Sequence, residues 1–357
     1  TRAAYNANVR EPVIQLAGVL ERATIPEEQK QELVDHVREQ VGAYAKEYRQ
    51  QLLAFYKSYA LKASSQEALR VILAQISSDR SPFLDFLTAV SRNTLLDVEH
   101  RMLEPMREVV TEFAPLHAIV GEEGATGEFE KYKAVVAQLL ADLGRLSGAE
   151  GESSDTASAK GDGLQGELSP AGRIELANLR GEAGSYNALV SEWLGSVGLL
   201  DYQKAPFQAP LEQLARLGRE DIERVVTRIW QREIRPELIR LKAKFPFDPA
   251  AKDEVTPSEL TSVLHPQSGK VFEAYRRYIE PLAELNDGAL RERRSIRGKL
   301  KLPSDLFPMM NRAATLSGRF WNEAGEPTPL TLRIATVPFE HGPSPKAALT
   351  LIYLNAG

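Results

Sequence analysis

The stretch PEEQKQELVDHVREQVGAYAKEYRQQLLAFYKSY (residues 26–59) decides the fold. Its apolar and aromatic side chains recur at steps of three and four residues, which places them on one face of an α-helix. These positions are Leu33, Val37, Val41, Tyr44, Tyr48, Leu52, Phe55 and Tyr59. Thr24 is the expected N-cap, with Pro26 and Glu27 in the first turn. Such a helix would be roughly 50 Å long, which suits a strut.

Helical patterns continue on both sides of this stretch. The sequences SSQE (64–67), SPFLDF (81–86) and TPSE (256–259) predict further N-termini, with Ser64, Ser81 and Thr256 as caps. Apolar faces follow at residues 69–76, 129–143, 189–194, 222–230 and 271–282, and Pro236 is expected to kink or end its helix. No repeat of 20–50 residues is visible, so the sequence does not predict a solenoid.

Near the end of the chain, apolar residues recur at every second position instead of every third or fourth. LTLRIATV (330–337) and ALTLIYL (348–354) alternate apolar and polar side chains and predict two strands joined by a turn-rich loop. A single hairpin is marginally stable in water, so these strands need further strands or a helical surface. The predicted fold is mainly α, with one or more multi-helix domains and one long helix. A small C-terminal β element follows, as the start of a β-sandwich-like domain.

Composition predicts the domain division. Residues 148–169 are Gly, Ser, Ala and acidic residues with little to bury, and are expected to form a flexible linker or loop. The predicted parts are therefore an N-terminal helical domain (1–147), this linker (148–169), a second helical region (170–325) and a truncated β element (326–357). Because the chain begins with Thr, we expect it to be a piece of a longer protein.

Length, composition and charge argue against several classes of protein and of chemistry. The chain has 357 residues, 43% hydrophobic and 26% charged, which is ordinary for a globular protein. A net charge of -5 argues against nucleic acid as a partner, and the lack of cysteine excludes disulfides and thiolate chemistry. No apolar run reaches the ~18–20 residues of a membrane helix. The first residues lack the apolar core of a signal peptide.

Motifs for catalysis are absent. The histidines, at positions 36, 100, 117, 265 and 341, show no metal-ligand spacing, and we expect His117 to pack at a helix end and His341 to lie in a loop. GDGLQG (161–166) matches a dinucleotide fingerprint only formally, since no strand precedes it. SGK (268–270) lacks the glycine of a phosphate-binding loop at position 264. The sequence predicts no enzyme, cofactor, metal or small-molecule substrate.

One basic run allows two interpretations. It comprises Arg291, Arg293, Arg294, Arg297, Lys299 and Lys301. The run could meet an acidic partner or lipid head groups, or it could be a solvated helix face, and we favour the solvated face. Phe320 and Trp321 are expected to belong to a core.

The segment KFPFDP (244–249) is expected to form a rigid corner rather than a partner contact. Asp248 and Pro249 resemble an N-cap and first turn, whereas Pro246 ends the preceding helix and keeps Phe245 out of the α region. Phe245 and Phe247 are expected to pack at the junction of two helical layers. The structural motif is thus Phe245, Pro246, Phe247, Asp248 and Pro249.

The segment FPFDPAAKDEVTPSELTSVLHPQSGKVFEAYRRYIEPL (245–282) resembles the periplasmic part of the IcmF/TssM family, the inner-membrane subunit of type VI secretion systems. The matching positions are Phe245, Pro246, Phe247, Asp248, Pro249, Glu254, Leu260, Gly269, Phe272, Tyr278 and Pro281. Residues 48–59, 81–96, 112–121, 129–143 and 306–321 are similar to further blocks of the family in the same order. The resemblance covers nearly all of the chain.

The resemblance implies a structural periplasmic subunit that bridges the inner membrane to an outer-membrane lipoprotein and self-assembles around the channel. Its implied partners are a TssJ-type lipoprotein, copies of itself in a ring, and a TssL-type subunit through parts outside this sequence. The implied location is the periplasm, with an inner-membrane anchor also outside it. A cytosolic helical scaffold or adaptor is the first alternative, and an envelope hydrolase the second. The sequence assigns no partner-binding residues.

Overall fold

The computed structural model of the chain describes residues 1–121, 127–148, 163–180, 185–293, 299–322, 324–334 and 349–353. The chain forms two compact units. Unit 1 comprises Thr1–Glu152 and Ala183–Leu217, and unit 2 comprises Ser153–Glu182 and Gly218–Gly357. The predicted division assigned residues 183–217 to the second region, whereas they pack within unit 1.

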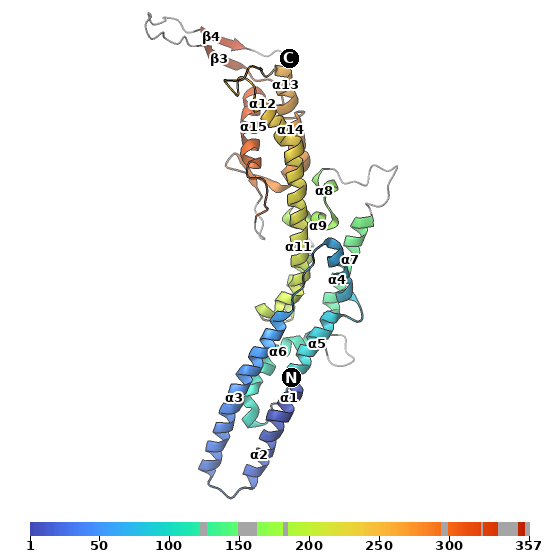
Figure 1. The fold of residues 1–357 in the computed structure, drawn as a ribbon, viewed down its shortest axis with the longest axis vertical. Coiled ribbons are helices and arrows are strands. Elements are labelled where there is room, and N and C mark those ends of the chain that lie inside the picture. Colours follow the sequence, from blue (N-terminus) through green and yellow to red (C-terminus); the bar gives the residue numbers. More distant parts are fainter. Residues whose placement is uncertain are drawn as a thin grey trace, which may run out of the picture. The chain divides into compact units, whose positions relative to one another are not determined.

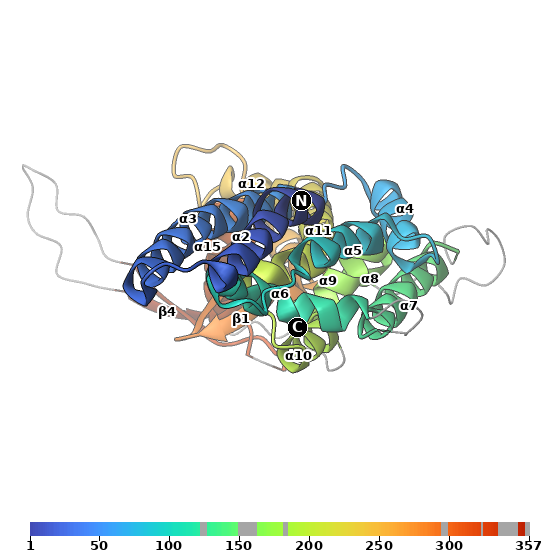
Figure 2. The same cartoon turned by 90° about the horizontal axis from the view of Figure 1, so that it is seen from below.

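All the secondary-structure elements in the described residues of unit 1 are helices (Figure 1). Its elements are α1 (Arg2–Tyr5), a π-helical turn (Asn6–Arg10), α2 (Glu11–Arg22), α3 (Glu27–Ser58), α4 (Gln66–Ser77), α5 (Pro82–Thr94), a 3₁₀ turn (Arg101–Met106), α6 (Arg107–Val120), α7 (Phe129–Gly148), α10 (Tyr186–Ser196) and the first part of α11 (Asp201–Ile229). The helices α2 and α3 form an antiparallel pair, visible side by side from below in Figure 2.

Unit 2 combines helices with two hairpins. It contains α8 (Leu164–Glu167), α9 (Pro170–Arg180), the rest of α11, a π-helical turn (Trp230–Ile234), α12 (Arg235–Lys242), α13 (Pro257–Leu264), α14 (Lys270–Ala274), a π-helical turn (Tyr275–Ile279), a 3₁₀ turn (Glu280–Leu282), β1 (Ala283–Asn286), β2 (Ala289–Glu292), α15 (Leu306–Phe320), β3 (Leu330–Ile334) and β4 (Leu349–Tyr353). The mainly α fold with one long helix and a small β element near the C-terminus is confirmed.

The long helix α3 has 32 residues, close to the predicted span, but its start and its buried face differ from the prediction. Pro26 rather than Thr24 is the N-cap, and no side chain bonds the first turn. The buried positions are Val34, Val41, Ala45, Tyr48 and Tyr56. The predicted positions Leu33 and Phe55 are 37% and 49% exposed. The buried face of α3 is therefore shifted by one residue near each end of the helix, from Leu33 to Val34 and from Phe55 to Tyr56. Sequence spacing alone cannot predict this shift, because it depends on which other elements cover the helix.

An aromatic cluster forms the core of unit 1. The ring of Phe207 on α11 lies 5.1 Å from that of Phe83 on α5, and 5.3 Å from those of Tyr132 on α7 and Trp193 on α10. The Tyr132 hydroxyl donates to the Phe207 carbonyl at 2.9 Å. These buried rings join four helices, and tilted or edge-on aromatic contacts of this kind add stability beyond the area they bury.

A polar network accompanies this core. Glu112 on α6, whose side chain is 8% exposed, accepts hydrogen bonds from Arg49 at 3.0 Å and from the Tyr202 hydroxyl at 2.8 Å. Gln203 donates to the Glu112 carbonyl at 3.0 Å. Burial raises the pKa of the Glu112 carboxyl, but the bonds from Arg49 and Tyr202 outweigh it, so the pKa lies below its ordinary value.

This lowered pKa predicts a pH dependence of stability. In the unfolded chain Glu112 binds its proton near pH 4.5, whereas in the folded protein it does so at lower pH. Its contribution is therefore fully present above that pH and is lost as the pH falls through the folded value. We expect the free energy of unfolding of the wild type to exceed that of Glu112→Gln at pH 7, and the gap to shrink below pH 4.5. Urea titrations across this range measure it, and a gap that stays constant would contradict the prediction.

Unit 2 has a second core, built from α9, α11, α12, α13, α14, α15 and the turns between them. Trp230 is 1% exposed, and its indole N–H donates to Asp305 at 3.0 Å. The chain does not end its helix at Pro236. A π-helical turn immediately precedes that proline, which occupies the first turn of α12. There its missing N–H costs little. Trp321 is buried and Phe320 packs against the core, as predicted.

Two antiparallel hairpins account for the strands. The predicted pair β3–β4 is confirmed, with Leu330 opposite Tyr353 and Ile334 opposite Leu349. Residues 335–337, 348 and 354 of the predicted strands lie outside the described residues. The hairpin β1–β2 was not predicted. Asp287 and Gly288, with φ of 52° and 73°, form its turn.

The C-terminal end of the predicted linker is structured. Leu164 and Leu168 are each 1% exposed and belong to the core of unit 2, and α8 lies between residues 163 and 168. These two leucines were too few to stand out in a stretch of small and acidic residues. Residues 149–162 of that linker lie outside the described residues.

Helix caps give a small, local test of this fold. Thr256 caps α13 as predicted, with its hydroxyl accepting from the Glu259 N–H at 3.1 Å. Replacing Thr256 by alanine is expected to lower the free energy of unfolding by about 1 kcal/mol, because a helix N–H loses its partner. The matched control is Thr315→Ala, an exposed position inside α15, which should change stability by less than about 0.5 kcal/mol. Equal effects of the two changes in chemical denaturation would contradict the capping role.

Candidate interaction site beside the Lys244–Pro249 loop

The segment between α12 and α13 folds back on itself. The N–H of Phe245 donates to the Asp253 carbonyl at 2.8 Å, and the Val255 N–H donates to the Phe245 carbonyl at 3.0 Å. The peptide bond between Phe245 and Pro246 is cis. The two hydrogen bonds join Phe245 at the start of the loop to residues 253 and 255 at its end, just before α13 begins.

The predicted N-cap at Asp248 is wrong. No helix begins at Pro249. Instead the Asp248 carboxylate accepts from the Ala250 N–H at 2.9 Å, and the Asp248 carbonyl accepts from the Ala251 N–H at 3.1 Å. An aspartate that bonds the main chain two residues on makes a local turn, which uses the same side-chain chemistry as a cap.

The two phenylalanines have different environments. Phe245 is 46% exposed, so the prediction that it packs between helical layers is wrong. Phe247 is half-buried and lines a cavity. The alternation follows from the turn, which directs one ring to solvent and the other to the unit 2 core.

Ion pairs hold the base of the loop. Lys244 donates to both carboxylate oxygens of Glu259 on α13 at 2.9 and 2.8 Å, and Arg240 lies 3.6 Å from the same carboxylate. The hydrogen bond from Lys244 lowers the pKa of Glu259. The pairing connects the end of α12 to the first turn of α13. That residues 245–249 act as a rigid corner stays a prediction.

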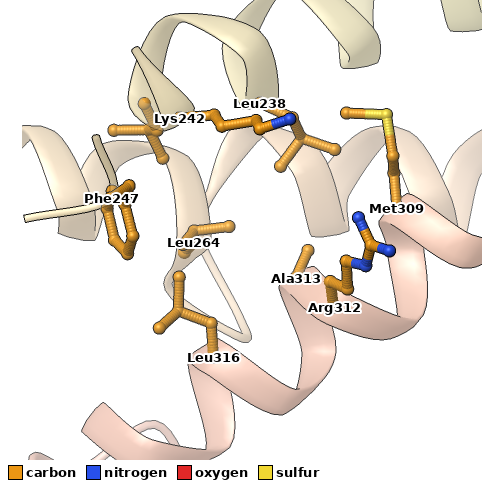
Figure 3. Close-up of a pocket in the computed structure, with 9 residues that line it drawn as sticks. Leu238, Lys242, Phe247, Leu264, Met309, Arg312, Ala313 and Leu316 are labelled. Atoms are coloured by element: carbon orange, nitrogen blue, oxygen red, sulfur yellow. The ribbon is translucent and has the colours of Figure 1, made fainter. Parts of the chain in front are cut away.

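A cavity of about 160 Å³ lies beside this loop (Figure 3). Helices α12 and α15, the end of α13 and the loop enclose it. Its lining residues are Leu238, Leu241, Lys242, Phe247, Leu264, Met309, Arg312, Ala313 and Leu316. Only Phe247 among them belongs to the predicted motif. The others lie on α12, α13 and α15, outside the apolar faces that the sequence predicted, and their meeting point depends on tertiary packing.

The histidines take structural positions where they are described. His117 on α6 lies 2.7 Å from the Thr94 hydroxyl, and burial lowers its pKa. Its predicted place at a helix end is confirmed. His265 follows α13 and lies 3.0 Å from the Gly325 carbonyl, with its ring 5.5 Å from that of Trp321. His341 lies outside the described residues.

The basic run is not a helix face in its described part. Arg291 lies in β2, Arg293 follows it, and Lys299 and Lys301 precede α15. All four are exposed. The turn at Asp287–Gly288 directs this segment into a strand, which explains the wrong prediction. Arg294 and Arg297 lie outside the described residues.

Within the described residues, no group of three or more His, Asp or Glu side chains is arranged to hold a metal ion. In the same part of the chain, no helix has both the length and the apolar character needed to cross a membrane.

Comparisons with known proteins identify the fold. No protein-family model and no curated protein match the sequence. Among solved structures, the chain is similar to one from a "Type VI secretion system membrane core complex", with a TM-score of 0.53 and 15% identity, covering 99% of this chain and 69% of that one. It is also similar to a chain of a "Type VI membrane complex", with a TM-score of 0.56 and 14% identity, covering 92% and 64%. The fold is therefore one found in type VI secretion membrane complexes.

Proposed function

We propose that this chain is part of a structural, non-catalytic subunit of a type VI secretion membrane complex, namely the periplasmic region of an IcmF/TssM-like protein. The observation that carries the proposal is a fold similarity extending over 99% of the chain to a component of such a complex. The motif order in the sequence supports the same family independently of that fold.

The proposed role is mechanical. Capped helices, a 32-residue helix in unit 1 and hairpins in unit 2 suit a subunit that holds a shape and docks other proteins. The proposed partners are an outer-membrane lipoprotein of the TssJ type, copies of the same chain around the channel, and a TssL-type subunit reached through segments outside this sequence. The five-residue motif 245–249 is proposed to act as a rigid corner within it.

The proposed compartment is the periplasm, with an anchor in the inner membrane outside this sequence. A site for a specific protease, inserted after Thr24 in the exposed turn between α2 and α3 of the full-length protein, tests this. We expect added protease to cut it in spheroplasts while a cytosolic marker with the same site stays intact. Cleavage only after lysis would instead favour the cytosolic scaffold.

Partner capture tests the assembly. The full-length protein, purified from detergent-solubilised envelopes, is expected to bring down an outer-membrane lipoprotein and untagged copies of itself. The matched control is the same purification from cells without the lipoprotein gene. Recovery of neither partner would contradict the proposed role.

A further inference from the structure

The cavity beside the loop has a size that suits one side chain. Ligand sites for drug-sized molecules measure about 300–1,000 Å³, whereas an apolar cavity of about 150 Å³ accepts a benzene-sized group. At about 160 Å³ this cavity matches a single aromatic ring or leucine side chain. It is open at the surface, so a side chain from another molecule can enter it.

The polar residues that line the cavity are both positively charged. Apart from Lys242 and Arg312, every lining residue is apolar (Figure 3). Both residues are exposed, and within the described part of the chain the side chain of neither makes a hydrogen bond or an ion pair. No carboxylate lines the cavity.

Neighbouring charges on the same helices are already matched. Glu237 on α12 pairs with Arg240 at 2.7 Å and lies 3.6 Å from Lys270, and Glu259 on α13 pairs with Lys244 at 2.8 Å. Asp248, which follows the lining residue Phe247, accepts from the Ala250 N–H at 2.9 Å. These three carboxylates are therefore engaged in contacts within the chain. Lys242 and Arg312 are left to complement negative charge supplied from outside.

We propose that this cavity is a docking pocket for a protein segment carrying one aromatic or leucine side chain flanked by Asp or Glu. The apolar side chain fills the cavity between Phe247, Leu264 and Leu316, and the flanking carboxylates meet Lys242 and Arg312. A buried apolar anchor in a pocket is the usual form of an interface hot spot, and complementary charge around it adds specificity. The inference rests on the cavity itself and holds whether or not the proposed secretion role is correct.

A short acidic peptide with a central fluorophenylalanine, acetyl-Asp-Glu-fluoroPhe-Glu-Asp-amide, is the direct probe. Fluorine NMR of this peptide with chain 1–357 is expected to show line broadening, with a Kd of roughly 1 mM for one buried ring. The same peptide with lysines in place of the acids is expected to bind about tenfold more weakly. The acidic peptide with alanine at its centre provides the control for contacts made by the flanks alone.

Variants locate the binding. Ala313→Leu fills the cavity and is expected to abolish broadening without lowering Tm, since it adds apolar volume to a void. The double variant Lys242→Glu/Arg312→Glu keeps the cavity and is expected to weaken the acidic peptide about tenfold. Its matched control is Lys299→Glu/Lys301→Glu, which makes the same charge change at exposed lysines that do not line the cavity.

Several results would overturn the proposal. These are no broadening with wild-type protein, equal broadening with Ala313→Leu, or equal binding of the acidic and basic peptides. Loss of self-association in the Lys242→Glu/Arg312→Glu variant, measured by sedimentation, would make the occupant a second copy of this chain and would also overturn it. Because the double variant alters only exposed side chains, the test survives if Ala313→Leu fails to fold.

Discussion

Replacing Phe207 with alanine is expected to lower the free energy of unfolding of unit 1 by about 3–5 kcal/mol. Phe207 is fully buried and contacts rings from α5, α7 and α10. Alanine leaves a cavity where the rings from these helices meet, and partial relaxation cannot recover the lost contacts.

Chemical denaturation with hydrogen exchange of unit 1 amides measures the effect. The matched control is Phe55→Ala, since Phe55 is 49% exposed and its loss is expected to cost less than about 1 kcal/mol. If the two alanine variants were equally stable, the aromatic cluster would not be the core that holds α5, α7, α10 and α11 together.

The second large effect is expected at a buried ion pair in unit 2. Glu175 on α9 has a fully buried side chain and lies 3.0 Å from Arg219 on α11. A Cβ added at Gly218 would lie 2.6 Å from the Ala171 carbonyl oxygen, which shows that α9 and α11 approach each other closely at this point. Arg219→Met removes the guanidinium that pairs with this buried carboxylate and is expected to cost about 3–5 kcal/mol.

A double-mutant cycle separates pairing from packing. Glu175→Leu combined with Arg219→Met removes both charges and is expected to be more stable than Arg219→Met alone. Arg240→Met, which removes a half-exposed guanidinium that pairs with Glu237 and lies 3.6 Å from Glu259, is the control and should cost at most about 1 kcal/mol. A double variant less stable than the single one would show that Glu175 acts through other contacts.

The helical part of the fold could be predicted because its determinants are local. Apolar spacing located the long helix, and Ser81 and Thr256 cap their helices as expected. Ser65 caps α4 one residue after the predicted Ser64, and its hydroxyl accepts from the Ala68 N–H at 3.1 Å. Caps depend on backbone angles just outside the helix, and the sequence constrains these less strictly than the helix itself.

The hairpin β1–β2 was missed although its turn carries a strong signal. Asp-Gly at residues 287–288 is a preferred pair for a two-residue turn with positive φ. The strands are only four residues each, and Leu285 is 72% exposed, so little apolar alternation marks them. Turn chemistry was the better guide at this place.

The candidate site was only half predictable. Its loop stands out by composition, since two prolines and two phenylalanines fall within residues 245–249. The cavity does not, because Leu238, Leu264 and Leu316 belong to three helices and meet only after folding. Which of two alternating aromatics faces inward was likewise decided by the turn at Asp248.

The way the chain passes between its units has a consequence for biosynthesis. Unit 1 is completed only by residues 183–217, which a ribosome makes after the segment 153–182 that belongs to unit 2. At about 5–20 residues per second, Phe83 and Tyr132 wait several seconds for Trp193 and Phe207 to emerge and cover them. During that interval the nascent protein carries an open apolar surface, which makes it a natural client for chaperones that hold unfinished chains.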